Sequence, residues 1–210
     1  MIGSEKTRKD LNSVTHDKLL RLTTCAVFAA ILCLCSPIVI PLAGPVPFAL
    51  QIFGVMLCGV TLDWATAQLS VLVYLLIGLF LPLFSGGNTG MTAVFGPTGG
   101  YIWSYLLMVP VIRALSSIPV SNRWLTYTLA FAGCVLAIVL CYLCGTTQFS
   151  LITERGFFDS LAICAVPFVG FDLIKAAFAA ILGVELAHIL ARLRPVNEKN
   201  RRCSRKPRFR

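Results

Sequence analysis

Two long stretches of this chain contain no acidic or basic residue: one runs from Leu22 to Leu62 and the other from Trp64 to Ile112. Charged residues make up only 13% of the 210 residues, hydrophobic residues make up 57%, and the mean hydropathy is +0.83. A soluble domain carries about a quarter charged residues, so this composition excludes one. Each uncharged stretch is longer than the ~20 residues of one span, so each holds about two. The sequence predicts a multi-pass integral membrane protein.

Several catalytic and cofactor motifs are also missing. The chain has no GxxxxGK[ST], no HExxH and no GxSxG, so it cannot hydrolyse ATP through a P-loop, and we expect neither an enzyme nor a bound cofactor. The nine cysteines are scattered through apolar segments, which favours reduced, buried thiols over disulfides. Cys141 and Cys144 form a CxxC, but without a second pair they do not predict a metal site. Glu185 and His188 are better explained as a pair at the interface than as a proton relay.

The apolar segments predict an all-α protein with six transmembrane helices. The expected spans are Leu19–Ile40, Phe48–Leu62, Trp64–Phe84, Tyr101–Leu115, Trp124–Cys144 and Phe168–Leu193. The segment Ser85–Gly100 is rich in Gly, Asn, Thr and Pro and is expected to be a loop too irregular for a helix. Ser160–Val166 is an apolar lead-in to the last span, broken at Pro167. The chain then divides into a polar N-terminus (1–18), the transmembrane domain (19–193) and a basic tail (194–210).

Basic residues set the expected orientation. Lysines and arginines cluster before the first span, between the fourth and fifth spans (Arg113, Arg123), and after the last span. The opposite loops hold only Arg155, beside acidic residues. By the positive-inside rule both termini are cytoplasmic, which requires an even number of spans. The basic tail directly follows a span, so it indicates topology and affinity for anionic lipid in the bilayer, not nucleic-acid binding.

One acid and one base, Asp172 and Lys175, lie within the last span. A charge in hydrocarbon costs about 2.5 to 3.5 kcal/mol on insertion scales, so a retained charge usually has a function. Residues three apart share one helix face, so both side chains can point into one cavity. The alternative is a salt bridge that only neutralises itself between helices. Asp172 and the Gly-rich loop are expected at the same external mouth.

Four motifs carry a resemblance to a known family. They are VPFALQ (Val46–Gln51), LSVLVYLLIGLFLPLFSGG (Leu69–Gly87), GPTGGY (Gly96–Tyr101) and PFxxxDxxK (Pro167–Lys175). Together they resemble BioY, the biotin-specific S component of energy-coupling-factor (ECF) vitamin transporters, over about Leu19 to Leu193. The chain departs from the family pattern at Gly170-Phe171, where a Pro-Gly normally precedes the aspartate. This difference bears on where the last helix begins.

The resemblance implies a six-helix subunit of the bacterial cell (inner) membrane that takes biotin from outside. It implies docking on a transmembrane coupling protein (T component) with two ATPase subunits (A components). Carried over residue by residue, ligand binding would fall to Asn88, Asp172 and Lys175. The small-residue face of Ala26 and Ala30 on the first helix would meet the coupling protein.

The chemistry of biotin agrees with these residues. Its ureido ring has two N–H donors, which a carboxylate accepts, and one carbonyl, to which an ammonium or an amide donates. We expect Asp172 to accept from the ureido ring and Asn88 to complete the set. Lys175 either donates to the ureido oxygen or pairs with Asp172 and holds it ionised. Phe48, Tyr101 and Tyr142 could wall the apolar rings.

Three other functions remain open from the residues: an S component for another vitamin such as thiamine or riboflavin, a carrier that moves biotin without ATPase partners, and an intramembrane enzyme. The last would need a nucleophile or metal ligands beside Asp172, and none stands at a convincing spacing.

Overall fold

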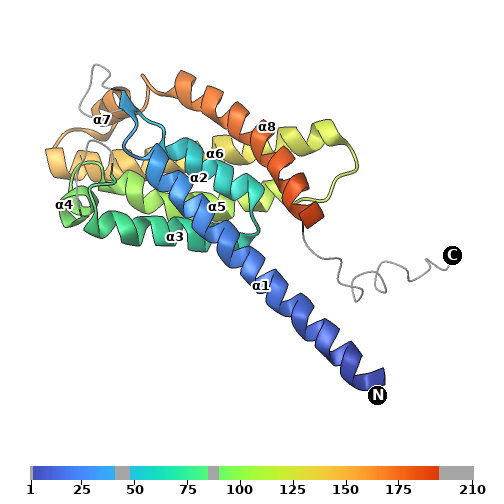
Figure 1. Cartoon of the computed structure of the whole chain (residues 1–210). Helices are drawn as coiled ribbons and strands as arrows, with labels where there is room; N and C mark the ends of the chain where they lie inside the picture. Colours follow the sequence, from blue (N-terminus) through green and yellow to red (C-terminus); the bar gives the residue numbers. More distant parts are fainter. Residues whose placement is uncertain (1, 41–47, 85–89, 194–210) are drawn as a thin grey trace.

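The structure is a computed structural model that describes residues 2–40, 48–84 and 90–193. Most of this part is helical, and one short hairpin joins the first two helices of the bundle (Figure 1). The elements are α1 (Ile2–Cys35), β1 (Val39–Ile40), β2 (Phe48–Ala49), α2 (Gln51–Thr61), α3 (Trp64–Phe80), α4 (Gly90–Phe95), α5 (Gly99–Ser116), α6 (Arg123–Thr153), α7 (Phe157–Cys164) and α8 (Val169–Leu193).

The helices pack into one elongated bundle, and the N-terminal part of α1 extends beyond it (Figure 1). The short helices α4 and α7 lie at one end, whereas the end of α8 and the start of α6 lie at the other (Figure 1). The helices α2, α5, α6 and α8 form the centre, where Met56, Met108, Ile112 and Ala176 are fully buried. Small residues allow close contact: Thr61 Oγ1 donates to the carbonyl of Gly183 at 3.4 Å, so α8 lies directly against α2.

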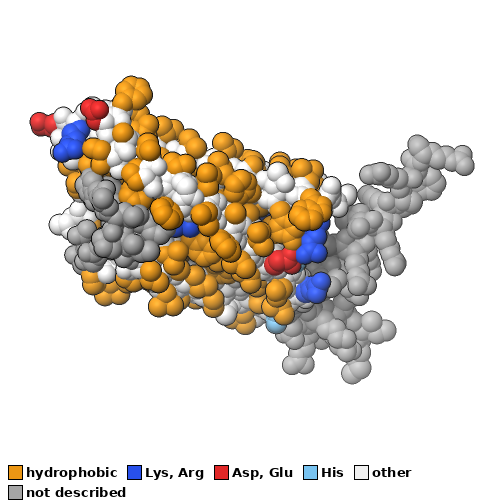
Figure 2. All heavy atoms as spheres, turned by 90° about the horizontal axis from the view of Figure 1, so that it is seen from above, with side chains coloured by type: hydrophobic (Ala, Val, Ile, Leu, Met, Phe, Trp, Pro, Cys, Tyr) orange, Lys and Arg blue, Asp and Glu red, His pale blue; other side chains and the backbone are white. Residues whose placement is uncertain are grey.

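The outer surface is that of a membrane protein. Large apolar side chains such as Phe80, Phe158 and Phe178 are more than half exposed. Hydrophobic side chains cover most of the face between the two ends, and charged side chains gather at the ends (Figure 2). This distribution places the middle of the bundle in hydrocarbon and its ends in the polar headgroup regions.

Three helices of the described part are long and apolar enough to cross a membrane: Thr15–Cys35 within α1, α6 and α8. The apolar helices α2 and α3 are shorter, with 11 and 17 residues. At 1.5 Å per residue, α2 spans only about 16 Å, roughly half of the hydrocarbon core. The expected all-helical membrane bundle is therefore present, while the count of six spans stays a prediction.

Several expected boundaries were wrong. The first helix ends at Cys35, not Ile40, because Val39–Ile40 pairs antiparallel with Phe48–Ala49. The third ends at Phe80, not Phe84. The segment Ser85–Gly100 is not wholly irregular, because α4 forms within it and α5 begins at Gly99.

The fifth expected span continues well beyond Cys144, to Thr153. The helix continues through polar residues after Cys144, several of which are hydrogen-bonded within the protein. Gln148 Nε2 donates to the carbonyls of Val94 (3.0 Å) and Gly96 (2.9 Å), and Thr147 Oγ1 donates to the carbonyl of Leu143. The two Gln148 bonds fasten the C-terminal part of α6 to α4 and to the GPTGGY motif.

Candidate functional site

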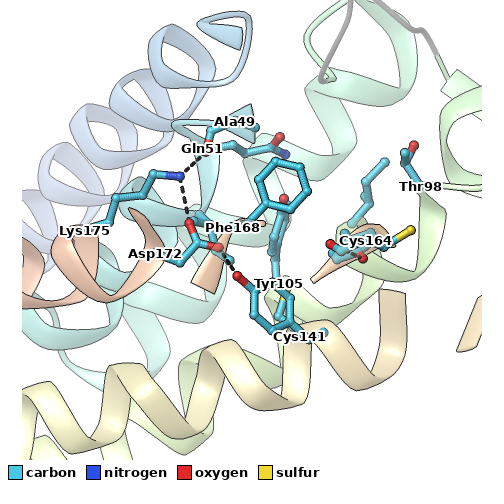
Figure 3. Close-up of a pocket in the computed structure, with 13 residues that line it drawn as sticks. Ala49, Gln51, Thr98, Tyr105, Cys141, Cys164, Phe168, Asp172 and Lys175 are labelled. Carbon is cyan, nitrogen blue, oxygen red and sulfur yellow. Dashed lines mark hydrogen bonds and ion pairs between the residues drawn. The ribbon is translucent and has the colours of Figure 1, made fainter. Parts of the chain in front are cut away.

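A cavity lies between α2, α5, α6 and α8 at the end of the bundle that carries α4 and α7 (Figure 3). Asp172 and Lys175 of α8 line it, together with Tyr101 of α5 and Tyr142 of α6. The remaining wall comes from residues of several elements: Ala49, Gln51, Ile52, Thr98, Ile102, Tyr105, Cys141, Cys164 and Phe168. Thr98 belongs to the Gly-rich segment, so this segment and Asp172 meet at one site as the sequence predicted.

Asp172 and Lys175 form a buried ion pair. Lys175 Nζ lies 2.9 Å from Asp172 Oδ1, and the two side chains are only 8% and 7% exposed. The same ammonium donates to the carbonyl of Ala49 at 2.7 Å, so the β1–β2 hairpin helps to hold it (Figure 3). Burying two charges is tolerated only when both are paired and hydrogen-bonded, as they are here.

The second carboxylate oxygen is bound by a tyrosine. Tyr142 Oη donates to Asp172 Oδ2 at 2.5 Å, a short, charge-assisted hydrogen bond. Both oxygens of Asp172 thus have a donor in the described part of the structure, and each keeps a lone pair for a further N–H. Despite Gly170-Phe171, α8 begins at Val169, so Asp172 lies in its first turn and reaches the cavity.

Tyr101 of α5 packs against α6, and a glycine on each of the two helices makes room for this contact. A Cβ on Gly145 of α6 would lie 2.3 Å from the Tyr101 ring, and a Cβ on Gly100 would lie 2.3 Å from the carbonyl of Cys144. The GPTGGY motif therefore lets α5 approach α6 so closely that the ring fits between them. Tyr101 Oη donates to the carbonyl of Cys164 at 3.3 Å, which links α5 to the end of α7.

A series of buried, hydrogen-bonded polar side chains leads away from the cavity. It was not predicted from the sequence. Gln51 lines the cavity at 1% exposure, and its Nε2 donates to Tyr74 Oη. Tyr74 Oη is 2.8 Å from Ser36 Oγ, and Ser36 in turn donates to the carbonyl of Leu83. The series joins α2, α3 and the end of α1 to Leu83, two residues before the Gly-rich segment. The sequence signal for this series is Gln51, the one amide in the otherwise apolar VPFALQ motif.

The other predicted site residues are Asn88, Phe48, Ala26 and Ala30. Asn88 and the side chain of Phe48 lie outside the described residues. Ala26 and Ala30 are exposed on α1, whereas their neighbours Phe28 and Ala29 are buried in the bundle. The two alanines thus face away from the core, on a surface that other helices of the described part do not cover. Glu185 contacts Arg123 and Tyr127 at the other end of the bundle.

The family model described as "BioY family" matches residues 6–192. The chain belongs to the BioY family. The motifs quoted from the sequence had indicated this family, and the match confirms it. The ionisable pair of the cavity and the motifs GPTGGY and VPFALQ all lie inside the matched range.

Curated relatives agree with the family model. The biotin transporter BioY2 of Lactococcus lactis subsp. cremoris is 34% identical over 183 residues, covering 84% of this chain and 94% of the relative. The biotin transporter BioY of Thermotoga maritima is 33% identical over 167 residues, covering 79% and 95%. These relatives are transporters, and this family is one of transporters and not of enzymes, so an intramembrane enzyme is excluded.

A solved structure shows the same fold. The S-component for biotin from an ECF-type ABC transporter superposes with a TM-score of 0.71 at 26% sequence identity, covering 85% of this chain and 93% of that one. The expected S-component fold of this BioY-family chain is therefore confirmed. None of these comparisons tests the individual site residues, whose roles in binding stay predictions.

Proposed function

We propose that this chain captures biotin at the external face of a bacterial inner membrane, as the substrate-binding subunit of an ECF-type ABC transporter. The observation that best supports this proposal is the buried pair Asp172–Lys175, with Tyr142, in a cavity between four helices. The names of the relatives and of the solved S-component support biotin as the substrate.

The geometry supports a specific mode of binding. Asp172, whose two oxygens are bound by Lys175 and Tyr142, accepts hydrogen bonds from the two N–H groups of the ureido ring. Lys175 and the amide of Gln51 stand beside it as donors for the ureido carbonyl. We also assign Asn88, which lies outside the described residues, to this set of donors. Phe168, Tyr101 and Tyr105 offer aromatic surface to the thioether ring and the aliphatic tail.

Transport against a gradient requires partners, because the sequence holds no P-loop with which to hydrolyse ATP. We assign energy coupling to a transmembrane T component and two ATPase A components. The exposed Ala26–Ala30 face of α1 supports docking of the T component, since small side chains let a partner helix approach closely. A carrier that moves biotin alone is the alternative, and uptake in a host with and without T and A components separates the two.

Calorimetry on the purified chain in detergent tests ligand capture, with desthiobiotin and thiamine as comparison ligands. We expect tight binding of biotin and no binding of thiamine. Asp172→Ala should abolish high-affinity binding, while Glu185→Ala, which removes a carboxylate from the same helix outside the cavity, should not. Tight binding by folded Asp172→Ala would refute the site, and preference for thiamine would refute the substrate.

A further inference from the structure

A second cavity lies at the opposite end of the same four helices. Its volume is about 290 Å³, and it is walled by the C-terminal ends of α2, α5 and α8 and by the first turn of α6. This is the end of the bundle away from α4 and α7 (Figure 1). The proposed capture of biotin makes no use of this cavity.

A guanidinium with spare donors faces this cavity. Arg113 of α5 lines the wall and is half-buried, and its Nη1 donates a long, weak hydrogen bond to the carbonyl of Val60 at 3.4 Å. Among the side chains that the structure describes, no carboxylate lies within 4 Å of it. A guanidinium carries five N–H donors, so most of its donors are available to a ligand.

Hydroxyl and imidazole groups surround the arginine. Ser116 lies one turn further along α5, and its buried Oγ has no hydrogen-bond partner among the described residues. Thr126 of α6 and His188 of α8 line the same wall. A buried hydroxyl without a partner costs free energy, so this group points to a bound acceptor.

The carboxylates nearby are already engaged. Asp63 also lines the cavity, but it caps α3 by accepting from Thr66 N (3.4 Å) and Thr66 Oγ1 (3.1 Å), and Arg21 lies 3.8 Å from it. Glu185 lies outside the cavity wall and is paired with Arg123 at 2.5 Å. Arg21 and Arg123 each have a carboxylate within 4 Å, whereas Arg113 has none among the described side chains.

We propose that the cavity binds the phosphate of an anionic phospholipid headgroup, held by Arg113 and Ser116. A planar guanidinium binds phosphate through two parallel N–H···O bonds, and the serine hydroxyl supplies a further donor. Basic pockets between helices on the cytoplasmic side are the usual sites for such headgroups.

The surroundings of the cavity favour a lipid over a free anion. Trp124 and Leu125 at the start of α6 are 81% and 44% exposed, and Ile189 and Leu193 at the end of α8 are 53% and 57% exposed. These apolar side chains lie on α6 and α8, two of the four helices whose ends wall the cavity. They lie at the level where tryptophan marks the membrane interface. Acyl chains can therefore run along α6 and α8 while the phosphate enters between the helix ends.

Thermal stability of the full chain, delipidated in a neutral detergent, tests this proposal. The probes are short-chain phosphatidylglycerol, phosphatidylcholine with the same acyl chains, and inorganic phosphate. We expect phosphatidylglycerol alone to raise the melting temperature in a saturable way. In R113Q its apparent affinity should fall by about tenfold or more, as expected when one charge-assisted pair is lost. R192Q, which removes an arginine of α8 that does not line the cavity, should respond like the wild type.

The milder variants R113K and S116A keep the test decisive if R113Q does not fold. Each should weaken the response to phosphatidylglycerol, because R113K keeps the charge but loses the paired N–H donors and S116A loses the hydroxyl. A wild-type response in both would overturn the proposal. Equal responses to the two lipids, an equal loss in R192Q, or a response to inorganic phosphate without one to phosphatidylglycerol would overturn it as well.

Discussion

The two ends of the α6–α8 pair carry nearly the same three functional groups. At one end, which the proposed orientation makes the outer end, Asp172 of α8 binds Lys175 and accepts a hydrogen bond from Tyr142 of α6. At the inner end Glu185 of α8 binds Arg123 and accepts a hydrogen bond from Tyr127 of α6. The antiparallel helices are thus joined twice by a tyrosine and a carboxylate, each time with a cation on the carboxylate.

Burial distinguishes the two ends. The outer ion pair is 7% and 8% exposed, whereas Arg123 and Glu185 are 69% and 43% exposed. Water and salt screen the inner pair, so it contributes little to stability. In the outer pair desolvation makes each hydrogen bond stronger and each lost partner more costly. The same groups therefore form the proposed binding site at one end and a surface contact between helices at the other.

The largest expected effect comes from neutralising the outer carboxylate. D172N keeps the shape of the side chain but leaves Lys175 charged and without its carboxylate, which typically costs about 3 to 5 kcal/mol. We expect a lower melting temperature and a loss of biotin affinity of about a hundredfold or more. Calorimetry and thermal unfolding in detergent measure both quantities, and E185Q at the inner end is the matched control.

A double variant sharpens this prediction. D172N/K175M removes both charges, so no buried charge is left unpaired, and its melting temperature should recover toward the wild-type value. Biotin affinity should stay low, because the carboxylate that accepts the ureido N–H groups is still absent. Recovery of affinity in the double variant would show that Asp172 serves folding and not ligand binding.

An intermediate effect is expected at the two tyrosines. Y142F removes one hydrogen bond to a buried carboxylate and should weaken biotin binding by about threefold to tenfold. Y127F makes the same change at the exposed end and should leave biotin affinity unchanged. Isothermal titration of both variants at one pH and salt concentration provides the comparison. Equal losses in the two would mean that the tyrosines act only by holding α6 and α8 together.

Sequence reasoning was strongest where one motif carries the information locally. The uncharged stretches indicated the membrane class. The motifs ending in Lys175 and Tyr101 indicated the family, and they contain five of the thirteen residues that line the cavity. The ion pair was found because a charge three residues from its partner within an apolar helix is visible in one line of sequence.

What the sequence did not reveal depends on contacts between distant segments. Gln51 meets Tyr74 across 23 positions, and Lys175 meets the carbonyl of Ala49 across 126. Hydropathy does not register such pairings, so Gln51 was seen only as part of a motif. The extension of α6 was missed for the same reason, since Gln148 has acceptors on α4 that only the fold brings near.

The smallest expected effect tests whether the inner contact has any role in binding. E185Q removes the charge partner of Arg123 and weakens the bond from Tyr127, but both groups keep access to water, which replaces the lost interaction. Biotin affinity should stay within about twofold of the wild-type value. Any drop in melting temperature should shrink as salt is raised, because salt already screens exposed charges in the wild type. A drop that persists at high salt together with weaker biotin binding would show that the inner contact sets the position of α8, and with it the aim of Asp172.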